Sequence, residues 1–253
     1  MIAGQEELYG KINSFTISNL PHSILLVGEV GSGKHEICEY IANKFNLQFF
    51  DVTNSINNEL IDQINQTKTN SLYVINISDL SIREQNILLK LYEEPDTNTY
   101  IILKSTSEYL PLETILSRSY VLKMKNFSRE LLSSYITSND KDYILNICTT
   151  PGQIEIANHT DIDKLRSLCD NMINRLKTAP LFNVLSIVNK INFNDEYDKF
   201  DLFLFIKVLS YECLMLKDGN INLYKLIKKL DRYIWSMSNK KQYFEHFLIE
   251  AWK

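Results

Sequence analysis

Residues 28–35, with the sequence Gly-Glu-Val-Gly-Ser-Gly-Lys-His, decide the fold of this 253-residue chain. They follow the apolar run Ile24–Val27 and precede a stretch in which an apolar residue recurs at every fourth position, as on one face of a helix. A strand, a glycine-rich loop with a lysine and a helix form a P-loop, whose backbone N–H groups hold phosphate where the helix begins. The residues predicted to bind nucleotide are Gly28, Gly31, Ser32, Gly33, Lys34 and His35.

The residue after the lysine departs from the P-loop pattern. This position normally holds Ser or Thr, whose hydroxyl binds Mg²⁺, and here it is His35. The loop therefore keeps its capacity for phosphate without the metal-binding hydroxyl, and we predict no metal site. Two interpretations of Lys34 remain open: either it binds ATP or ADP without hydrolysis, or it is a vestigial residue that fills an empty loop.

Short apolar runs alternate with helical patterns from the amino terminus to about Asn126. Alternating β and α segments predict an α/β domain with a mostly parallel sheet covered by helices on both faces. Beyond Asn126 we expect no strands, a helix capped by Ser128, a break at 149–152 and a turn at Gly219 and Asn220. The predicted strands are 24–27, 48–52, 72–77, 100–103 and 121–124, and the predicted helices are 35–45, 56–65, 82–92, 181–190, 200–216, 223–236 and 241–252.

Composition narrows the class of protein. A hydrophobic content of 45% is typical of a globular chain, and a net charge of −4 argues against a general polyanion binder. The four cysteines are far apart and form no CxxC pair, so we expect reduced thiols rather than a zinc module. No secretory signal or membrane span is apparent, which predicts a cytoplasmic location. The abundance of Ile, Asn and Lys is typical of an AT-rich genome, such as that of a phage or a low-GC bacterium.

Two further blocks carry a family resemblance. Residues 86–95 are Asn-Ile-Leu-Leu-Lys-Leu-Tyr-Glu-Glu-Pro, and residues 110–119 are Leu-Pro-Leu-Glu-Thr-Ile-Leu-Ser-Arg-Ser. They resemble the NALLKxLEEP and LPxTILSRC signatures of AAA+ sliding-clamp loader subunits. Gly4-Gln5 and residues 20–23, Leu-Pro-His-Ser, are similar to the corresponding segments of bacterial DNA polymerase III delta prime subunits. The resemblance extends from about residue 3 to residue 126, and is weaker from 127 to 157.

The resemblance implies a domain organisation. Residues 1–126 would form the AAA+ P-loop domain, 127–161 a small helical lid domain and 162–253 a helical collar that closes the oligomer. The zinc-bearing loop of many family members would fall within 46–71, a segment that contains no cysteine. We therefore expect no zinc.

The resemblance also locates positions that an active ATPase needs for hydrolysis. The Walker B aspartate falls at Asn76 and the catalytic glutamate at Ile77, so both acids are missing, and Asp79 is the nearest carboxylate. The second-sensor arginine falls at Gln153, so this charge is absent too. Thr106 fits the first-sensor position. Because phosphoryl transfer depends on positioning and electrostatics, these losses predict no ATP hydrolysis at this site.

One catalytic group is retained. Arg118 aligns with the arginine that family members project onto the nucleotide of a neighbouring subunit, as an arginine finger in trans. The cysteine that follows it in the family is Ser119 here. The alternative is that Arg118 merely pairs with a local carboxylate such as Glu113.

The resulting hypothesis is a catalytically silent, delta-prime-like subunit that lends Arg118 to a neighbouring ATPase. Its partners would be the other subunits of a clamp-loader hetero-pentamer, a sliding clamp and primer-template DNA, the last through phosphate contacts. Two alternatives remain: an active clamp-loader ATPase that uses Asp79 as its Walker B acid, or a standalone AAA+ replication adaptor.

Overall fold

The computed structural model describes residues 1–52, 56–93, 97–193, 199–216, 221–237 and 239–252. The described chain divides into two compact units, residues 1–131 and 132–253. The two units are described separately below. No helix in the described ranges is both long enough and apolar enough to cross a bilayer.

The first unit is built on a parallel five-stranded sheet with strand order β2-β3-β4-β1-β5. Because neighbouring parallel strands need crossover connections, a helix follows almost every strand. Its elements are α1 (Glu6–Ser14), β1 (Ser23–Val27), α2 (Lys34–Phe45), β2 (Gln48–Val52), α3 (Asn58–Asn65), β3 (Ser71–Asn76), the 3₁₀ turn η1 (Ile77–Asp79), α4 (Ile82–Leu88), α5 (Lys90–Glu93), β4 (Thr99–Ser105), α6 (Glu113–Leu116), β5 (Tyr120–Lys123) and the start of α7 (Arg129–Tyr135).

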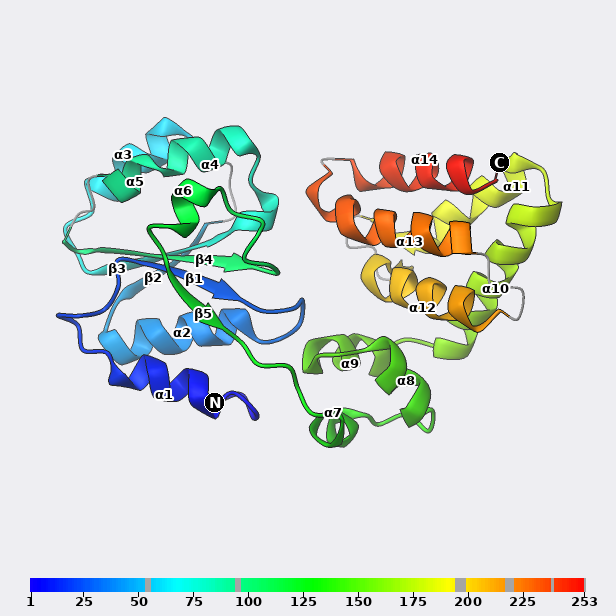
Figure 1. Ribbon diagram of the computed structural model, residues 1–253, viewed down its shortest axis with the longest axis horizontal. Helices are drawn as coiled ribbons and strands as arrows, with labels where there is room; N and C mark the ends of the chain where they lie inside the picture. Colours follow the sequence, from blue (N-terminus) through cyan, green and yellow to red (C-terminus); the bar gives the residue numbers. More distant parts are fainter. Residues whose placement is uncertain (53–55, 94–96, 194–198, 217–220, 238, 253) are drawn as a thin grey trace. The chain divides into compact units, whose positions relative to one another are not determined.

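Helices cover both faces of this sheet, as Figure 1 shows: α1 and α2 lie on one face, and α3 to α6 on the other. Alternate strand residues supply the two cores. Leu26, Val74 and Ile102 pack with Ile37 and Ile41 of α2. The intervening residues, such as Leu25, Ile75 and Leu103, pack on the opposite face. The predicted α/β fold is therefore confirmed, with burial on both faces explaining the nearly continuous apolar strands.

Side-chain caps set several helix boundaries in this unit. The Asn57 side chain accepts a hydrogen bond from the N–H of Leu60 and starts α3. Ser81 and Glu84 form a reciprocal capping box at the start of α4. The predicted helix 82–92 is interrupted at Leu89, where the N–H of Tyr92 bonds to the Leu89 carbonyl in a tighter i→i+3 turn. Glu94 and Pro95, part of the quoted signature, lie outside the described residues.

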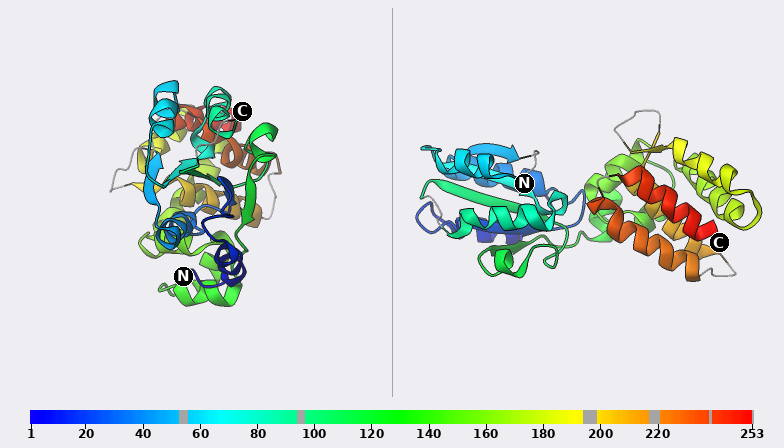
Figure 2. Two further views of the ribbon diagram at one scale, coloured as in Figure 1. Left: turned by 90° about the vertical axis from the view of Figure 1, so that its left-hand side faces the viewer. Right: turned by 90° about the horizontal axis from the view of Figure 1, so that it is seen from above.

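The second unit is mainly helical. Its elements are the rest of α7, α8 (Lys141–Ile147), α9 (Pro151–Asn158), α10 (Ile162–Thr178), α11 (Leu181–Leu185), the 3₁₀ segment η2 (Ser186–Lys190), β6 (Ile191–Asn192), β7 (Phe200–Asp201), α12 (Leu202–Met215), α13 (Ile221–Tyr233), the 3₁₀ segment η3 (Ile234–Ser236) and α14 (Lys240–Trp252). Helices α12, α13 and α14, coloured orange to red, lie side by side in Figures 1 and 2.

Several expectations for this region are met. Ser128 accepts a hydrogen bond from the N–H of Leu131 and so caps α7. The break at 149–152 is present, with Pro151 at the first position of α9, where its missing N–H costs nothing. All four cysteines are free and buried. The predicted turn at Gly219 and Asn220 lies outside the described residues.

The expectation that strands stop after Asn126 is wrong. Strands β6 and β7 form a short parallel ladder that pairs Ile191 with Phe200 and Asn192 with Asp201. Two-residue strands carry no alternation that a sequence pattern could reveal. The expected lid and collar meet near residue 161, but helices on both sides of that point contact α12 within one compact unit. The division into three domains stays a prediction.

Candidate functional site

The glycine-rich loop leaves the carboxyl end of β1 and leads into α2. Gly31 and Gly33 have φ angles of 76° and 91°, a left-handed region that favours glycine. At Gly28, a Cβ atom would lie only 2.8 Å from Ser32 Oγ and 2.9 Å from Met124 Sδ. No side chain caps α2, so its first N–H groups point toward the loop. This is the backbone geometry that holds a phosphate group.

Lys34 turns back into the loop. Its ammonium donates hydrogen bonds to the carbonyl oxygens of Gly28, at 2.6 Å, and Glu29, at 2.7 Å. Burial, followed by the positive charge of Lys104, lowers the pKa of Lys34 from 10.5 to about 8. The lysine is therefore held where an incoming phosphate would meet it.

The lowered pKa of Lys34 predicts how stability depends on pH. Between about pH 8 and 10.5 the unfolded chain holds a proton at this lysine that the folded chain has released. The contribution of this lysine to the free energy of unfolding should therefore rise with pH in this window, by up to about 3 kcal/mol. Burial raises the pKa of the four cysteines, which lowers stability with pH equally in the wild type and in Lys34→Met. In urea unfolding, the stability of the wild type relative to Lys34→Met should therefore increase between pH 7.5 and pH 10.

The matched control for that experiment is Lys68→Met, which removes an exposed lysine away from the loop. It should keep the wild-type dependence on pH. Equal pH dependence of Lys34→Met and the wild type would contradict the assigned environment of Lys34.

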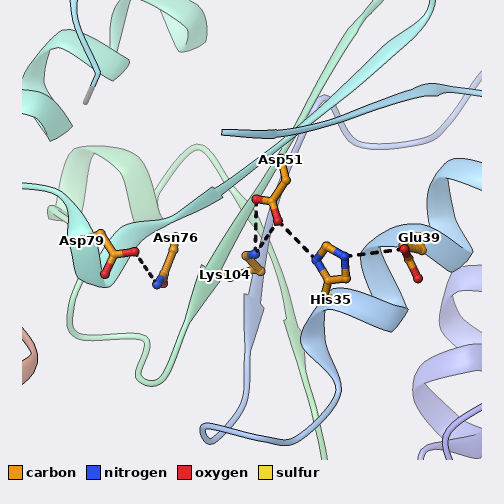
Figure 3. A network of polar contacts seen from close by, with 6 residues as sticks. All are labelled: His35, Glu39, Asp51, Asn76, Asp79 and Lys104. Carbon is orange, nitrogen blue, oxygen red and sulfur yellow. Dashed lines mark hydrogen bonds and ion pairs between the residues drawn. The ribbon is translucent and has the colours of Figure 1, made fainter. Parts of the chain in front are cut away.

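A network of polar contacts lies beside the loop (Figure 3). The ammonium of Lys104, on β4, is 3.4 Å from both carboxylate oxygens of Asp51, on β2. His35, the first residue after the loop lysine, places Nδ1 3.3 Å from Asp51 and Nε2 3.5 Å from Glu39. The edge of its ring also contacts Phe49. The Asp51 carboxylate thus lies between Lys104 and His35.

Sheet register explains why these residues meet. Asp51, Asn76 and Lys104 are in phase with the strand residues whose side chains pack on α2, and all three stand at the carboxyl end of the sheet. Asn76 pairs directly with Lys104 across β3 and β4. In parallel α/β sheets this edge is where ligands bind. The site therefore combines the P-loop with residues from three strands.

The predicted Walker B position also has its own contact. Asn76 ends β3, and its amide donates a 2.8 Å hydrogen bond to the Asp79 carboxylate in the following turn (Figure 3). Asp79 is therefore tied to Asn76 at the end of the strand. Among the described residues no group of three or more His, Cys, Asp or Glu could hold a metal ion. His35, Asn76 and Lys104 do not supply the hydroxyl and carboxylates that Mg²⁺ prefers in a P-loop protein.

Sequence reasoning missed Asp51 and Lys104. One signal was available for the lysine: it interrupts an apolar strand, β4, near its carboxyl end. A charged side chain there, in phase with the buried residues Tyr100 and Ile102, faces the ligand-binding edge rather than solvent. Its side chain is only 16% exposed. The pairing of Asp51 with Lys104 across strands β2, β3 and β4 could not be inferred without the register.

The remaining predicted positions lie as follows. Thr106 comes directly after β4 and is exposed. Gln153 is buried in α9 of the second unit, and its side-chain oxygen accepts a 2.8 Å hydrogen bond from the N–H of Thr149. Its side chain therefore bonds the residue that precedes the N-cap, Thr150, of its own helix. Nothing places Gln153 relative to the P-loop, because the two lie in different units.

Arg118 lies at the amino-terminal end of the parallel strands, whereas the loop lies at their carboxyl end. It precedes β5, whose first residue, Tyr120, pairs with Ile24 near the start of β1, whereas the loop follows the end of β1. The intervening strand spans roughly 13 Å. The exposed Arg118 guanidinium donates one 3.1 Å hydrogen bond to the Thr114 carbonyl. Within the described part of the chain, no carboxylate forms an ion pair with it, Glu113 included.

A cavity of about 450 Å³ adjoins this arginine. Ser117, Arg118 and Tyr120 line one part of it, and Tyr92 and Thr99 another. The buried Thr99 hydroxyl has no hydrogen-bond partner among the described residues. The surface beside Arg118 is therefore concave and retains hydrogen-bonding capacity.

Comparison with known proteins adds a family match. Residues 50–128, about a third of the chain, match the family model described as DNA polymerase III, delta subunit. The uncharacterized MG007 homologue of Mycoplasma pneumoniae is 25% identical over 122 residues. That alignment covers 48% of this chain and 47% of the relative, so the chain matches about half the length of this curated relative.

One solved structure shows a similar fold. A DNA polymerase III gamma subunit-related protein from Thermotoga maritima superposes with a TM-score of 0.52 at 16% identity, over 98% of both chains. The RuvB Holliday junction branch migration motor of the same organism gives a TM-score of 0.48 at 14% identity, over 91% of this chain and 77% of RuvB. The first likeness covers nearly the whole chain and shows a similar fold, an α/β unit followed by helices.

Proposed function

We propose that this clamp-loader-like AAA+ protein is a catalytically silent, delta-prime-like subunit that donates Arg118 to the nucleotide site of a neighbouring ATPase. It would assemble with other clamp-loader subunits into a hetero-pentamer that opens a sliding clamp and loads it onto primed DNA. Contact with that DNA would be made to phosphates, without sequence specificity. The match of residues 50–128 to a DNA polymerase III delta family supports the class of complex.

The observation that carries this proposal is the position of Arg118. Its guanidinium is exposed, and no described carboxylate forms an ion pair with it. It lies at the amino-terminal end of the strands, whereas the chain's own P-loop lies at their carboxyl end. An arginine so placed cannot assist chemistry in its own loop, yet it can reach a nucleotide held by another subunit. The concave surface beside it offers such a subunit a place to dock.

The chain's own P-loop lacks the groups that hydrolysis requires. His35 replaces the hydroxyl that binds Mg²⁺, Asn76 and Ile77 replace the Walker B acids, and Gln153 replaces the second-sensor arginine. ATP or ADP could still be held by Lys34 and the loop amides. Without the metal and the acids, the developing charge of the transition state would not be stabilised.

The alternative is an active ATPase that uses Asp79, a hypothesis favoured only by the hydrogen bond from Asn76 to Asp79. We expect the purified chain to show no Mg²⁺-dependent ATP hydrolysis above buffer, and Asp79→Ala to change nothing. A phosphate-release assay with and without Mg²⁺ measures this. Turnover that requires both Mg²⁺ and Asp79 would establish the alternative.

Assembly is tested by reconstitution. The chain should copurify in a complex with the clamp-loader ATPase and clamp encoded by the same genome, and DNA should stimulate ATP hydrolysis by that complex. If the chain associates with neither protein, the standalone adaptor hypothesis replaces this proposal.

A further inference from the structure

The side chain that faces the P-loop from the end of β4 is a lysine. Lys104 shares a sheet face with the core of α2 and is largely buried, although its ammonium carries a charge. A charged group is seldom buried unless something compensates it. The single described carboxylate within ion-pair distance of Lys104 is Asp51, at 3.4 Å, which also faces His35.

Two lysines therefore converge on the loop, one from each side. Lys34 enters from the start of α2 and binds the loop carbonyls, while Lys104 enters from β4. The repulsion between them is visible in the lowered pKa of Lys34, to which Lys104 is the second-largest contributor after burial. A polyanion placed between the two ammonium groups would relieve this repulsion.

We propose that Lys104 takes the electrostatic role of the missing Mg²⁺, so that this loop binds a nucleoside polyphosphate without a divalent metal. The inference rests on the nucleotide-binding capacity included in the proposed function and specifies its chemistry. In P-loop enzymes the metal bridges and neutralises the β- and γ-phosphates. Here an ammonium on the adjacent strand supplies positive charge beside the loop.

Asp51 would act as the resting partner of Lys104. Without ligand, its carboxylate holds the ammonium at 3.4 Å and contacts His35 on its other side (Figure 3). When phosphate enters the loop, Lys104 can exchange this partner for a phosphate oxygen, while Asp51 retains His35. Metal ligation by Asp51 is disfavoured in this arrangement, because the Lys104 ammonium and the His35 ring already contact the carboxylate.

Calorimetric titration of the full chain with ATP, in excess EDTA and in excess Mg²⁺, tests the proposal. The dissociation constant should differ by less than about threefold between the two conditions. Lys104→Met should weaken metal-free binding about tenfold or more, since it removes a charge-assisted contact and keeps the side-chain volume. Lys104→Arg should retain most of the affinity.

Lys123→Met is the matched control. It removes a lysine from the edge strand β5, which β1 separates from β4, and its ammonium pairs with Glu108 rather than with Asp51. Binding by this variant should equal that of the wild type. Asp51→Asn gives a second test that preserves Lys104: it removes the competing partner and should tighten metal-free binding about threefold.

Three results would overturn the proposal: no binding of ATP in either condition, binding only with Mg²⁺, or unchanged metal-free binding by folded Lys104→Met. None of them affects the role proposed for Arg118, which acts on another subunit's nucleotide. Conversely, if ATP turnover by the reconstituted complex did not depend on Arg118, the expected result of this titration would be unchanged. The two proposals therefore fail separately.

Discussion

Replacing Arg118 with alanine should lower ATP turnover at the neighbouring site of the reconstituted complex by about 10³-fold. The finger stabilises charge that develops on the transferring phosphoryl group, so its loss acts on the chemical step. Arg118→Lys should recover little of the rate, because a point charge lacks the planar fork of a guanidinium. Single-turnover hydrolysis by the assembled complex, with clamp and primed DNA present, measures the effect.

The matched control is Arg83→Ala, which removes an exposed arginine from α4 in the same unit. Its complex should hydrolyse ATP at the wild-type rate. Equal rates for wild type and Arg118→Ala, in complexes of equal composition, would exclude the arginine-finger role.

Replacing Phe205 with alanine should destabilise the second unit by about 3–5 kcal/mol. Phe205 is fully buried in α12, and its ring meets Phe244 of α14 edge to face at 5.8 Å. Its removal leaves a cavity that the packed helices cannot close completely. Urea unfolding followed by tryptophan fluorescence reports on this unit specifically, because both tryptophans, Trp235 and Trp252, lie within it.

Phe182→Ala provides the comparison for the same unit. Phe182 is 81% exposed on α11, so the same chemical change there should alter the free energy of unfolding by less than about 0.5 kcal/mol. A similar loss of stability in both variants would contradict the assigned core.

Much of the first unit could be predicted because its signals are local. The segment 48–52 is apolar enough to predict a strand, and β2 has these bounds. The P-loop was predicted from its glycines and lysine, and Gly31 and Gly33 have the positive φ angles that such a loop needs. The two short strands β6 and β7 carry no pattern, so the sequence could not predict them.

The polar network of the candidate site could not be predicted from local sequence patterns. Lys104, Asp51 and His35 come from β4, β2 and α2, and they meet only because the strands pair in a particular register. The effect of the Lys104 charge on the pKa of Lys34 has the same origin. By contrast, the opposite placement of Arg118 and the P-loop follows from topology, since one precedes β5 and the other follows β1.

The most direct test compares Lys34→Ala with Arg118→Ala in the same reconstituted complex, with DNA- and clamp-stimulated ATP hydrolysis as the measurement. We predict that Arg118→Ala removes turnover at the neighbouring site, whereas Lys34→Ala leaves the rate close to that of the wild type. If Lys34→Ala instead removes a share of turnover, this chain hydrolyses ATP itself and the account of a silent arginine donor is wrong.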